Sequence, residues 1–286
     1  MTVRRLPTGP DTAPADPGPE QARPRVHVEH VMGTAVVLTV HGAHDGPEVG
    51  DALAGACRML HDADEVFSTW NPSSPMTRLR RGEARLDQLD PRAAEQISEV
   101  LELCRQACSL TEGWFDPWAL PGGVDPTGLV KGWAIERALA VLDARGLTAM
   151  VNGGGDIAWC GQPPDGGWRL GIRHPWVADG LACVVVGDGV RRAIATSAGY
   201  ERGAHFVDPF TGEHTMGALA SGTVAGPDLA VADALATALV VGGRPVLDAI
   251  RRLPDARGGG RYEAYAIGPA GEEWATKGFP FAEAQP

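Results

Sequence analysis

Residues 124–137 read VDPTGLVKGWAIER, and residues 232–237 read ADALAT. The first stretch joins a carboxylate and a tight turn to a lysine at the start of an expected helix. The second stretch puts Asp233 and Thr237 one helical turn apart, so that both oxygens lie on one face. Hard cations such as Mg²⁺ prefer oxygen ligands in this arrangement, and a nearby lysine and glycine amides favour phosphate. Together the two stretches predict metal-assisted chemistry on a phosphoanhydride.

The composition is that of an ordinary globular protein. The chain has 286 residues, of which 21% are charged and 44% hydrophobic. This length allows one large domain or two small ones. The net charge of -11 argues against a nucleic-acid groove, so we expect no nucleic-acid partner. The same charge means that a phosphate ligand needs a cation close to it.

Cysteine usage indicates a reducing compartment. The number of cysteines is five, which is odd, and no CxxC pair occurs. Cys104 and Cys108 are four residues apart on an expected helix, but no neighbouring His or Cys completes a zinc set. We therefore expect all five thiols to be reduced and mostly buried, as is typical of a cytoplasmic protein.

The two ends of the chain have the composition of tails. Residues 1–24 are rich in Pro, Ala, Asp and Gly and are expected to be a disordered N-terminal tail. They contain no apolar signal-peptide segment and no lipid-attachment cysteine, and no stretch has the length of a membrane span. We therefore expect no membrane anchor and a cytoplasmic location. The domain is expected over residues 25–281, with a frayed end over 282–286.

Hydrophobic periodicity predicts the secondary structure. Helices are expected at 48–67, 91–110 (with Asp90 as N-cap), 131–145 (closed by Gly146), 230–241 and 246–253. Strands are expected at 27–41 (with a bulge at Gly33-Thr34), 149–158 (broken at Gly153–Gly155), 168–173, 182–186, 192–196, 205–207, 222–225 and 262–267. Because helices come early and strands cluster later without regular βαβ alternation, we predict an α+β fold with largely antiparallel sheets and packed helices.

Three segments each have an ordinary structural interpretation and a ligand-binding one. Met32 belongs either to a buried strand or to a thioether contact with a flat aromatic ligand. Trp70 belongs either to a solvated turn or to a stack on a ring system. The turn at 113–117, GWFDP, either is structural or offers a carboxylate beside two aromatic rings to a heterocycle.

Three further residues allow the same choice. Lys131 would usually be a solvated charge, but its apolar surroundings at a helix start favour an anion site. Asp233 lies among Ala, Leu and Val, where a buried carboxylate is costly without a partner, and a metal ion would remove that cost. His205 is by default a core group, and the DPFTG that follows at 208–212 is turn chemistry.

Taken in order, the segments resemble the FAD:protein FMN transferase family, also called the ApbE or thiamine-biosynthesis-lipoprotein family. Any one match is weak, but seven in the family's order over residues 32–241 are hard to explain by chance. They are Met32-Gly33-Thr34, the segment of Ser68, Trp70 and Ser74, GWFDP at 113–117, VDPTGLVKG at 124–132, NGGGD at 152–156, TSAGY through HFVDPFTG at 196–212, and DALAT at 233–237.

The resemblance implies an ApbE-like, T-fold-related single domain that depends on Mg²⁺, although Mn²⁺ also suits oxygen ligands. Such an enzyme takes FAD as substrate, attaches FMN through a phosphoester to a Thr or Ser of an acceptor protein, and releases AMP. Two alternatives remain open. One is a Mg²⁺-dependent FAD pyrophosphatase giving FMN and AMP, and the other is a non-catalytic FAD-binding protein.

The resemblance also implies roles for individual residues. The Gly128 carbonyl, Asp233 and Thr237 would hold the metal. The FAD site would be lined by Met32, Trp70, Trp114, Phe115, Asp116, Asp125 and Lys131. His205, Asp208 and Lys131 would act at the reacting phosphate, with the base left open between His205 and a nearby carboxylate. Departures from the family's pattern are Trp70 for Tyr, Pro126-Thr127, Val130, and Glu136 for Asp.

Overall fold

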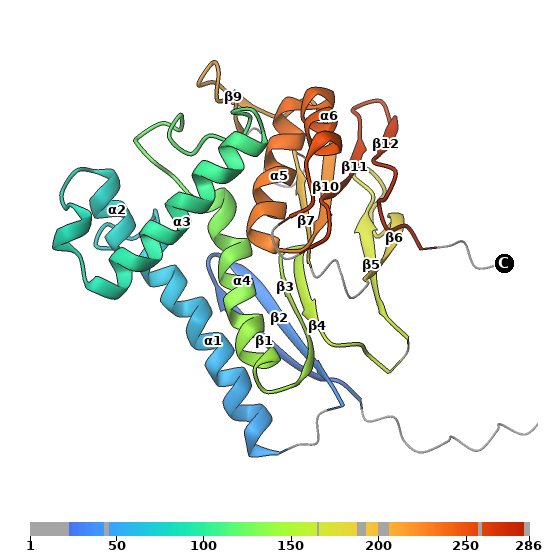
Figure 1. Ribbon diagram of the computed structural model, residues 1–286, viewed down its shortest axis with the longest axis horizontal. Coiled ribbons are helices and arrows are strands. Elements are labelled where there is room, and N and C mark those ends of the chain that lie inside the picture. Colours follow the sequence, from blue (N-terminus) through green and yellow to red (C-terminus); the bar gives the residue numbers. More distant parts are fainter. Residues whose placement is uncertain are drawn as a thin grey trace, which may run out of the picture.

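The computed structural model describes residues 23–42, 46–164, 166–187, 193–199, 206–256 and 259–282. Its centre is an eight-stranded antiparallel sheet with the order β1-β2-β3-β4-β7-β10-β11-β12 (Figure 1). The strands are β1 (Arg25–Val31), β2 (Thr34–His41), β3 (Thr148–Gly153), β4 (Asp156–Cys160), β7 (Ala193–Ala198), β10 (Ser221–Gly226), β11 (Glu263–Ile267) and β12 (Glu273–Ala275). Two small sheets pair β5 (Trp168–Arg173) with β6 (Leu181–Gly187), and β8 (Phe206–Val207) with β9 (His214–Thr215).

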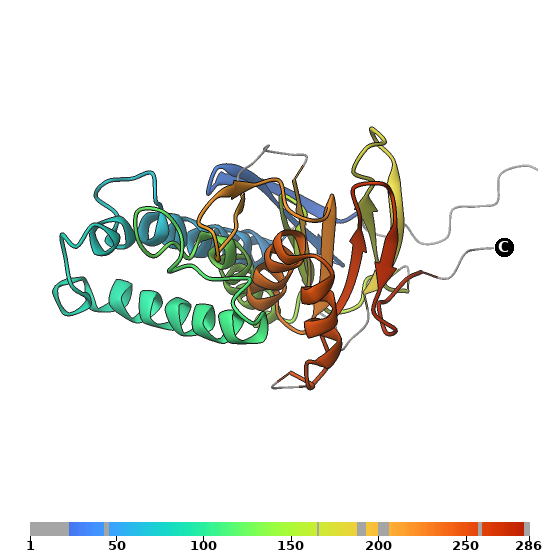
Figure 2. The same cartoon turned by 90° about the horizontal axis from the view of Figure 1, so that it is seen from above.

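The helices lie against one face of the large sheet, and the β5–β6 ribbon lies on the other side (Figures 1 and 2). They are α1 (Pro47–Phe67), α2 (Pro75–Arg80), the 3-10 turn η1 (Leu86–Gln88), α3 (Pro91–Leu110), α4 (Thr127–Asp143), α5 (Leu229–Gly242) and α6 (Arg244–Arg252). This arrangement confirms the predicted α+β class with antiparallel sheets.

Alternation along the central strands builds two hydrophobic cores. In β11, Ala264 and Ala266 face the helix core, whereas Tyr265 and Ile267 face the core under β5 and β6. Side chains on the two sides of a strand alternate, so one strand supplies both layers. The small residues on the helix side let α5 pack closely on the sheet, and every residue of α5 except the half-buried Thr237 is buried.

The predicted single strand over 27–41 is wrong. The chain reverses at Met32 and Gly33, whose φ angles are 53° and 70°, and forms the β1–β2 hairpin instead of a bulge. A two-residue turn with positive φ at both positions matches the twist of antiparallel strands. The reversal puts Met32 at the end of the sheet where Gly154, in the β3–β4 turn, packs beside Thr34.

Helix starts also differ from the prediction. Helix α4 begins at Thr127 instead of Lys131, so Lys131 lies one turn inside the helix. Helix α2 was not predicted; Ser74 caps it by accepting a hydrogen bond from the Thr77 N–H, and Pro75 is its first residue. Helix α3 was predicted with its correct bounds and with Asp90 as its N-cap.

The sequence also led to expectations about the two ends of the chain, the state of the cysteines and membrane-spanning segments. All five cysteines are free, but only Cys104 and Cys160 are buried. Residues 1–22 and 283–286 of the expected tails lie outside the described residues, and the domain bounds stay a prediction. Within the described ranges, the helices are too short or too polar for a membrane span. The cytoplasmic location stays a prediction.

Candidate functional site

Helices α4 and α5 cross at Gly132. A Cβ at this position would lie 2.6 Å from the Leu229 carbonyl oxygen and 3.0 Å from the Ala230 Cα. Any side chain would therefore push the helices apart. Close contact between the two backbones brings the second turn of α4 against the first turns of α5.

The start of α5 is held by two carboxylates. Asp228 accepts from the Val231 N–H at 3.0 Å. Glu136, from α4, accepts from the Leu229 N–H at 2.6 Å and the Ala230 N–H at 3.3 Å. These bonds satisfy three of the N–H groups that have no partner within the helix at its start. The two bonds from Glu136 also tie α4 to α5. Burial, followed by the Asp228 charge, raises the pKa of Glu136 to about 7.

Asp233 is a buried carboxylate with an incomplete set of partners. Its side chain lies in an apolar helix and the residue is 5% exposed. Within the described part of the chain, its Oδ2 atom has no hydrogen-bond partner. Burial raises the pKa of Asp233, and the Asp156 charge raises it further, against the opposing effects of Lys131 and the Gly132 N–H. A buried oxygen without a hydrogen bond lowers the stability of the fold unless a group outside the described residues satisfies it.

Lys131 is held by a second buried carboxylate. Its Nζ lies 2.5 Å from Oδ2 of Asp156, the first residue of β4. The other Asp156 oxygen accepts from the Thr196 N–H at 3.1 Å. Asp156 was not assigned a role from the sequence, although its NGGGD segment was noted. The feature of the sequence that could have indicated a role for Asp156 is its position directly after a glycine-rich turn.

Thr237 and Gly128 lie close to each other. The Thr237 hydroxyl lies 3.2 Å from the Ser197 hydroxyl of β7. A Cβ on Gly128 would lie 4.0 Å from the Thr237 Oγ1 and 3.1 Å from the Phe115 ring. The absence of a side chain therefore opens the start of α4 toward Thr237. Ser197 is a further residue that the sequence left unassigned, although it belongs to the TSAGY segment.

The donor set fits a hard divalent cation. The orphan oxygen of Asp233 and the hydroxyls of Thr237 and Ser197 are oxygen donors on neighbouring elements, and Mg²⁺ and Mn²⁺ prefer such donors. Among the described residues, the buried carboxylates of Asp156 and Asp233 both lie near the Lys131 ammonium group. A positive ion would balance the excess negative charge.

Two residues of the predicted flavin site have structural partners that occupy their polar groups. Asp125 pairs with Arg80 at 2.8 Å and accepts from the N–H and hydroxyl of Thr127, the first residue of α4. Asp116 accepts from the Trp118 N–H at 2.9 Å in a short turn. Both carboxylates therefore shape the segment that leads into α4.

The aromatic candidates differ in exposure. Phe115 is buried against Gly128. Trp114 makes an edge contact with Phe210 of the β8–β9 loop, with ring centroids 4.8 Å apart. Trp70 is 95% exposed, between α1 and α2. The structure therefore does not gather these rings into one contact set among the described residues.

Of the two remaining candidates, Asp208 lies in the turn between β8 and β9. Asp208 accepts from the Phe210 and Thr211 N–H groups at 2.8 and 3.2 Å, which fixes its own turn. His205 lies outside the described residues. Of the predicted residues, the structure brings together Gly128, Lys131, Asp233 and Thr237.

Comparisons with known proteins point to one family. The model of the ApbE family matches residues 120–257, which include α4, Asp156 and α5. A curated FAD:protein FMN transferase of Vibrio cholerae is 34% identical over 130 residues, and one of Rhodobacter capsulatus is 34% identical over 131. Each match covers 42% of this chain, but 39% of the first relative and 24% of the second.

The fold extends the likeness beyond that segment. The solved structure named flavin transferase ApbE, from Vibrio cholerae, has a TM-score of 0.74 and 20% identity, and the match covers 90% of this chain and 98% of that one. The chain thus resembles the ApbE family over residues 120–257 and shares the fold of this solved structure over 90% of its length.

Proposed function

We propose that the protein transfers FMN from FAD to a Ser or Thr hydroxyl of an acceptor protein and releases AMP. The observation that carries the proposal is the buried Asp233 carboxylate, with one oxygen unsatisfied within the described residues. Thr237 follows it by one helical turn, and Lys131 contributes a cation close by. The names of the curated relatives support the same activity.

Asp233, Thr237 and the Gly128 carbonyl are the proposed ligands of Mg²⁺, with Mn²⁺ as a substitute. Ser197, bonded to Thr237, orients that hydroxyl. When bound, the cation would offset charge on the pyrophosphate and stabilise the departing AMP. The crossing of α4 and α5 at Gly132 supports this ligand set, because it brings the two helices that carry the oxygen donors close together.

Lys131 supplies a fixed positive charge to the substrate phosphates. Asp156 positions its ammonium group, and the Thr196 N–H holds Asp156 in turn. In the reaction, the acceptor oxygen bonds to the phosphorus of the FMN half, and the bond from that phosphorus to the bridging oxygen breaks. The electron pair leaves with AMP, and the hydroxyl proton passes to a base. His205 and a neighbouring carboxylate stay open as that base.

The flavin would be bound by Met32, Trp70, Trp114 and Asp116, whose side chains are at least partly exposed. The Trp70 ring is open to solvent and is free to stack on a flat ligand. Phe115 and Asp125 would act by holding the start of α4, since Phe115 packs on Gly128 and Asp125 bonds Thr127. Asp208 would stabilise the β8–β9 turn, which would lie beside the acceptor protein.

The test is chromatography of FAD incubated with purified protein, with and without Mg²⁺ and with and without a flavinylation-acceptor domain. AMP release that needs both, with the acceptor gaining the mass of FMN, is the expected result. AMP and free FMN without acceptor would replace the proposal by an FAD pyrophosphatase. FAD that stays intact under every condition, and with several acceptor domains, would overturn both enzymatic functions.

A further inference from the structure

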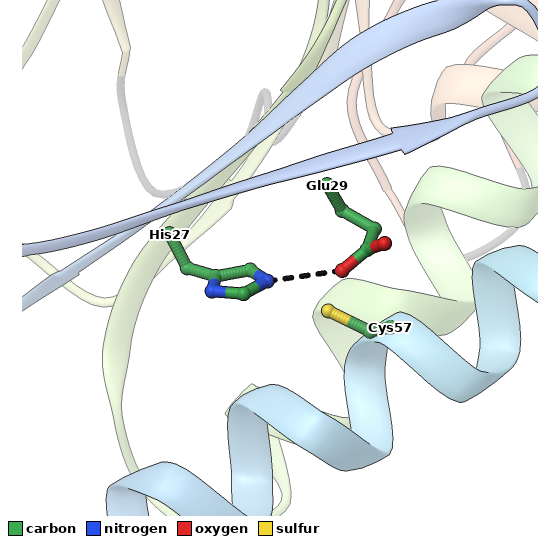
Figure 3. Close-up of side chains that lie close together, drawn as sticks. All are labelled: His27, Glu29 and Cys57. Carbon is green, nitrogen blue, oxygen red and sulfur yellow. Dashed lines mark hydrogen bonds and ion pairs between the residues drawn. The ribbon is translucent and has the colours of Figure 1, made fainter.

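A second cluster of metal-ligand side chains lies at the edge of the large sheet. His27 and Glu29 are two residues apart on β1, so their side chains lie on the same face of the strand. Cys57 and His61 are four residues apart on α1, one helical turn along the same face. Figure 3 shows His27, Glu29 and Cys57 pointing toward one another from the strand and the helix.

The distances between these groups are short. His27 Nε2 lies 3.1 Å from one Glu29 oxygen, and His61 Nε2 lies 3.1 Å from the other. One donor atom each from His27, Glu29 and Cys57 lies within 4.8 Å of the others. A tetrahedral zinc ion holds its ligand atoms about 3.3–3.8 Å apart, given bonds of about 2.0–2.3 Å. Small side-chain rotations would therefore bring the three atoms onto one ion.

The surroundings leave space for an ion. A cavity of about 390 Å³ is lined by the cluster together with small residues of α1, Gly50 and Ala54. The side chains of His27 and Glu29 are 41% and 26% exposed, so an ion has access from solvent. Arg25 and Arg58 also line the cavity. Burial and the adjacent Glu29 raise the pKa of Cys57 to about 11, against the opposing charge of Arg58, so a bound ion would displace the thiol proton.

We propose that His27, Glu29 and Cys57 bind a zinc ion, and that His61 orients the Glu29 carboxylate through its second oxygen. A thiolate, an imidazole and a carboxylate together suit Zn²⁺, whereas Mg²⁺ and Ca²⁺ take oxygen donors. A histidine bonded to a ligating carboxylate is a typical outer partner of a metal site. The fourth position is left to water.

The site is separate from the one proposed for flavin transfer. β1 is the edge strand, and β2 and β3 stand between it and β4, which carries Asp156. Bound zinc would cross-link the edge strand to α1, a contact that otherwise rests on the Glu29–His61 pair and on apolar packing. The alternative is that Glu29 merely pairs with two histidines, in which case Cys57 has no part in the cluster's affinity for metal.

The experiment uses the full chain stripped with a chelator and titrated with Zn²⁺ against a chromophoric competitor, in the presence of excess Mg²⁺. We expect one zinc per chain. Cys57→Ser and His27→Ala should each weaken binding at least 100-fold, and His61→Ala should weaken it about 10- to 100-fold. Cys108→Ser, which changes another half-buried cysteine outside the cluster, is the matched control and should bind like the wild type.

Cobalt provides a second readout. Co²⁺ in place of Zn²⁺ should give a thiolate charge-transfer band that disappears in Cys57→Ser and persists in Cys108→Ser. Circular dichroism of each metal-free variant checks that it is folded. Absence of binding to the wild type, a cobalt spectrum without the thiolate band, or equal weakening by both cysteine variants would overturn the zinc site. Flavin transfer should be unchanged in Cys57→Ser, so this test does not depend on the outcome for the proposed function.

Discussion

The Asp233 carboxylate is buried, and within the described residues one of its oxygens receives no hydrogen bond. Asp233→Asn keeps its size but removes the charge that would bind a cation. We expect Mg²⁺-dependent release of AMP to fall by at least about 100-fold, because the amide is a poor ligand for a hard ion. Without metal, the variant should be as stable as the wild type or more so, since a buried charge is costly.

Steady-state kinetics and urea unfolding in a chelator check the two parts of this prediction. Thr39→Ser, which changes a hydroxyl residue of β2 away from the α4–α5 crossing, serves as the control for a mild change in the sheet. Full Mg²⁺-dependent activity in Asp233→Asn would remove Asp233 from the metal site.

Lys131 and Asp156 should contribute as a pair. Lys131→Met leaves the buried Asp156 carboxylate without its ammonium partner, and we expect it to destabilise the fold by about 1–3 kcal/mol. Adding Asp156→Asn should recover part of this loss, because the double variant buries no unpaired charge. A double-mutant cycle on unfolding free energies measures the coupling, which we expect at about 1–3 kcal/mol.

The same two variants distinguish the effect of the Lys131–Asp156 pair on stability from the effect of Lys131 on phosphate binding. Both Lys131→Met and the double variant should lose FAD turnover, since neither supplies a cation to the phosphates, whereas stability recovers only in the double variant. A coupling energy near zero would mean that the Lys131–Asp156 contact is not maintained in solution.

Sequence patterns predicted Gly128, Lys131, Asp233 and Thr237 because each belongs to a helix start or a helical turn, where spacing along the chain fixes neighbours. Asp156 and Ser197 needed the tertiary fold. The Asp156–Thr196 and Ser197–Thr237 contacts each join residues 40 positions apart. The periodicity of a single helix or strand cannot reveal contacts between residues this far apart in the chain.

At the scale of elements, α4 and α5 are held together at Gly132 and at the Glu136 clamp. The pKa of Glu136 is raised to about 7 by burial and by Asp228, so between about pH 4.5 and 7 the folded protein holds a proton that the unfolded chain has released. The free energy of unfolding should therefore fall as pH rises through this window. Glu136→Gln removes the titrating group and should reduce the fall between pH 5 and 7 by about 2 kcal/mol.

Urea unfolding in a chelator at pH 5 and 7 measures this effect. Asp233, whose pKa is also raised, gives a slope of the same sign, so the fall should become smaller in Glu136→Gln without vanishing. Glu95→Gln, at an exposed position on α3, is the matched control and should keep the wild-type slope. A wild-type slope in Glu136→Gln would show that the α4–α5 clamp does not titrate there.

The β1–β2 hairpin shows why some element boundaries escape sequence analysis. Apolar residues continue on both sides of the turn, and the turn holds Met-Gly instead of the Asn-Gly that usually marks it. A non-glycine residue at φ 53° is uncommon, so nothing in the residue types indicated a reversal at Met32. In contrast, α3 carries an aspartate cap and a proline start, and its bounds were predicted correctly.

At the scale of the whole molecule, the α+β fold class could be predicted from the sequence, but the order of the strands in the sheet could not. β2 pairs with β3 although α1, α2, α3 and α4 intervene in the chain. β4 pairs with β7 across the inserted β5–β6 ribbon. Both pairings are set by how the helix core and the ribbon core enclose the central strands, which depends on all the elements at once.

The two proposed metal sites lie on different elements of this architecture, so their contributions to stability should add. A ligand present at about 100 times its dissociation constant stabilises the folded state by about 2.7 kcal/mol. Mg²⁺ and Zn²⁺ should therefore each raise the melting temperature of chelator-treated protein by several degrees, and together by about the sum. Asp233→Asn should lose the Mg²⁺ shift and keep the Zn²⁺ shift, whereas Cys57→Ser should do the reverse. Differential scanning calorimetry of the two variants with each metal measures all four shifts, and loss of both shifts in either variant would contradict two independent sites.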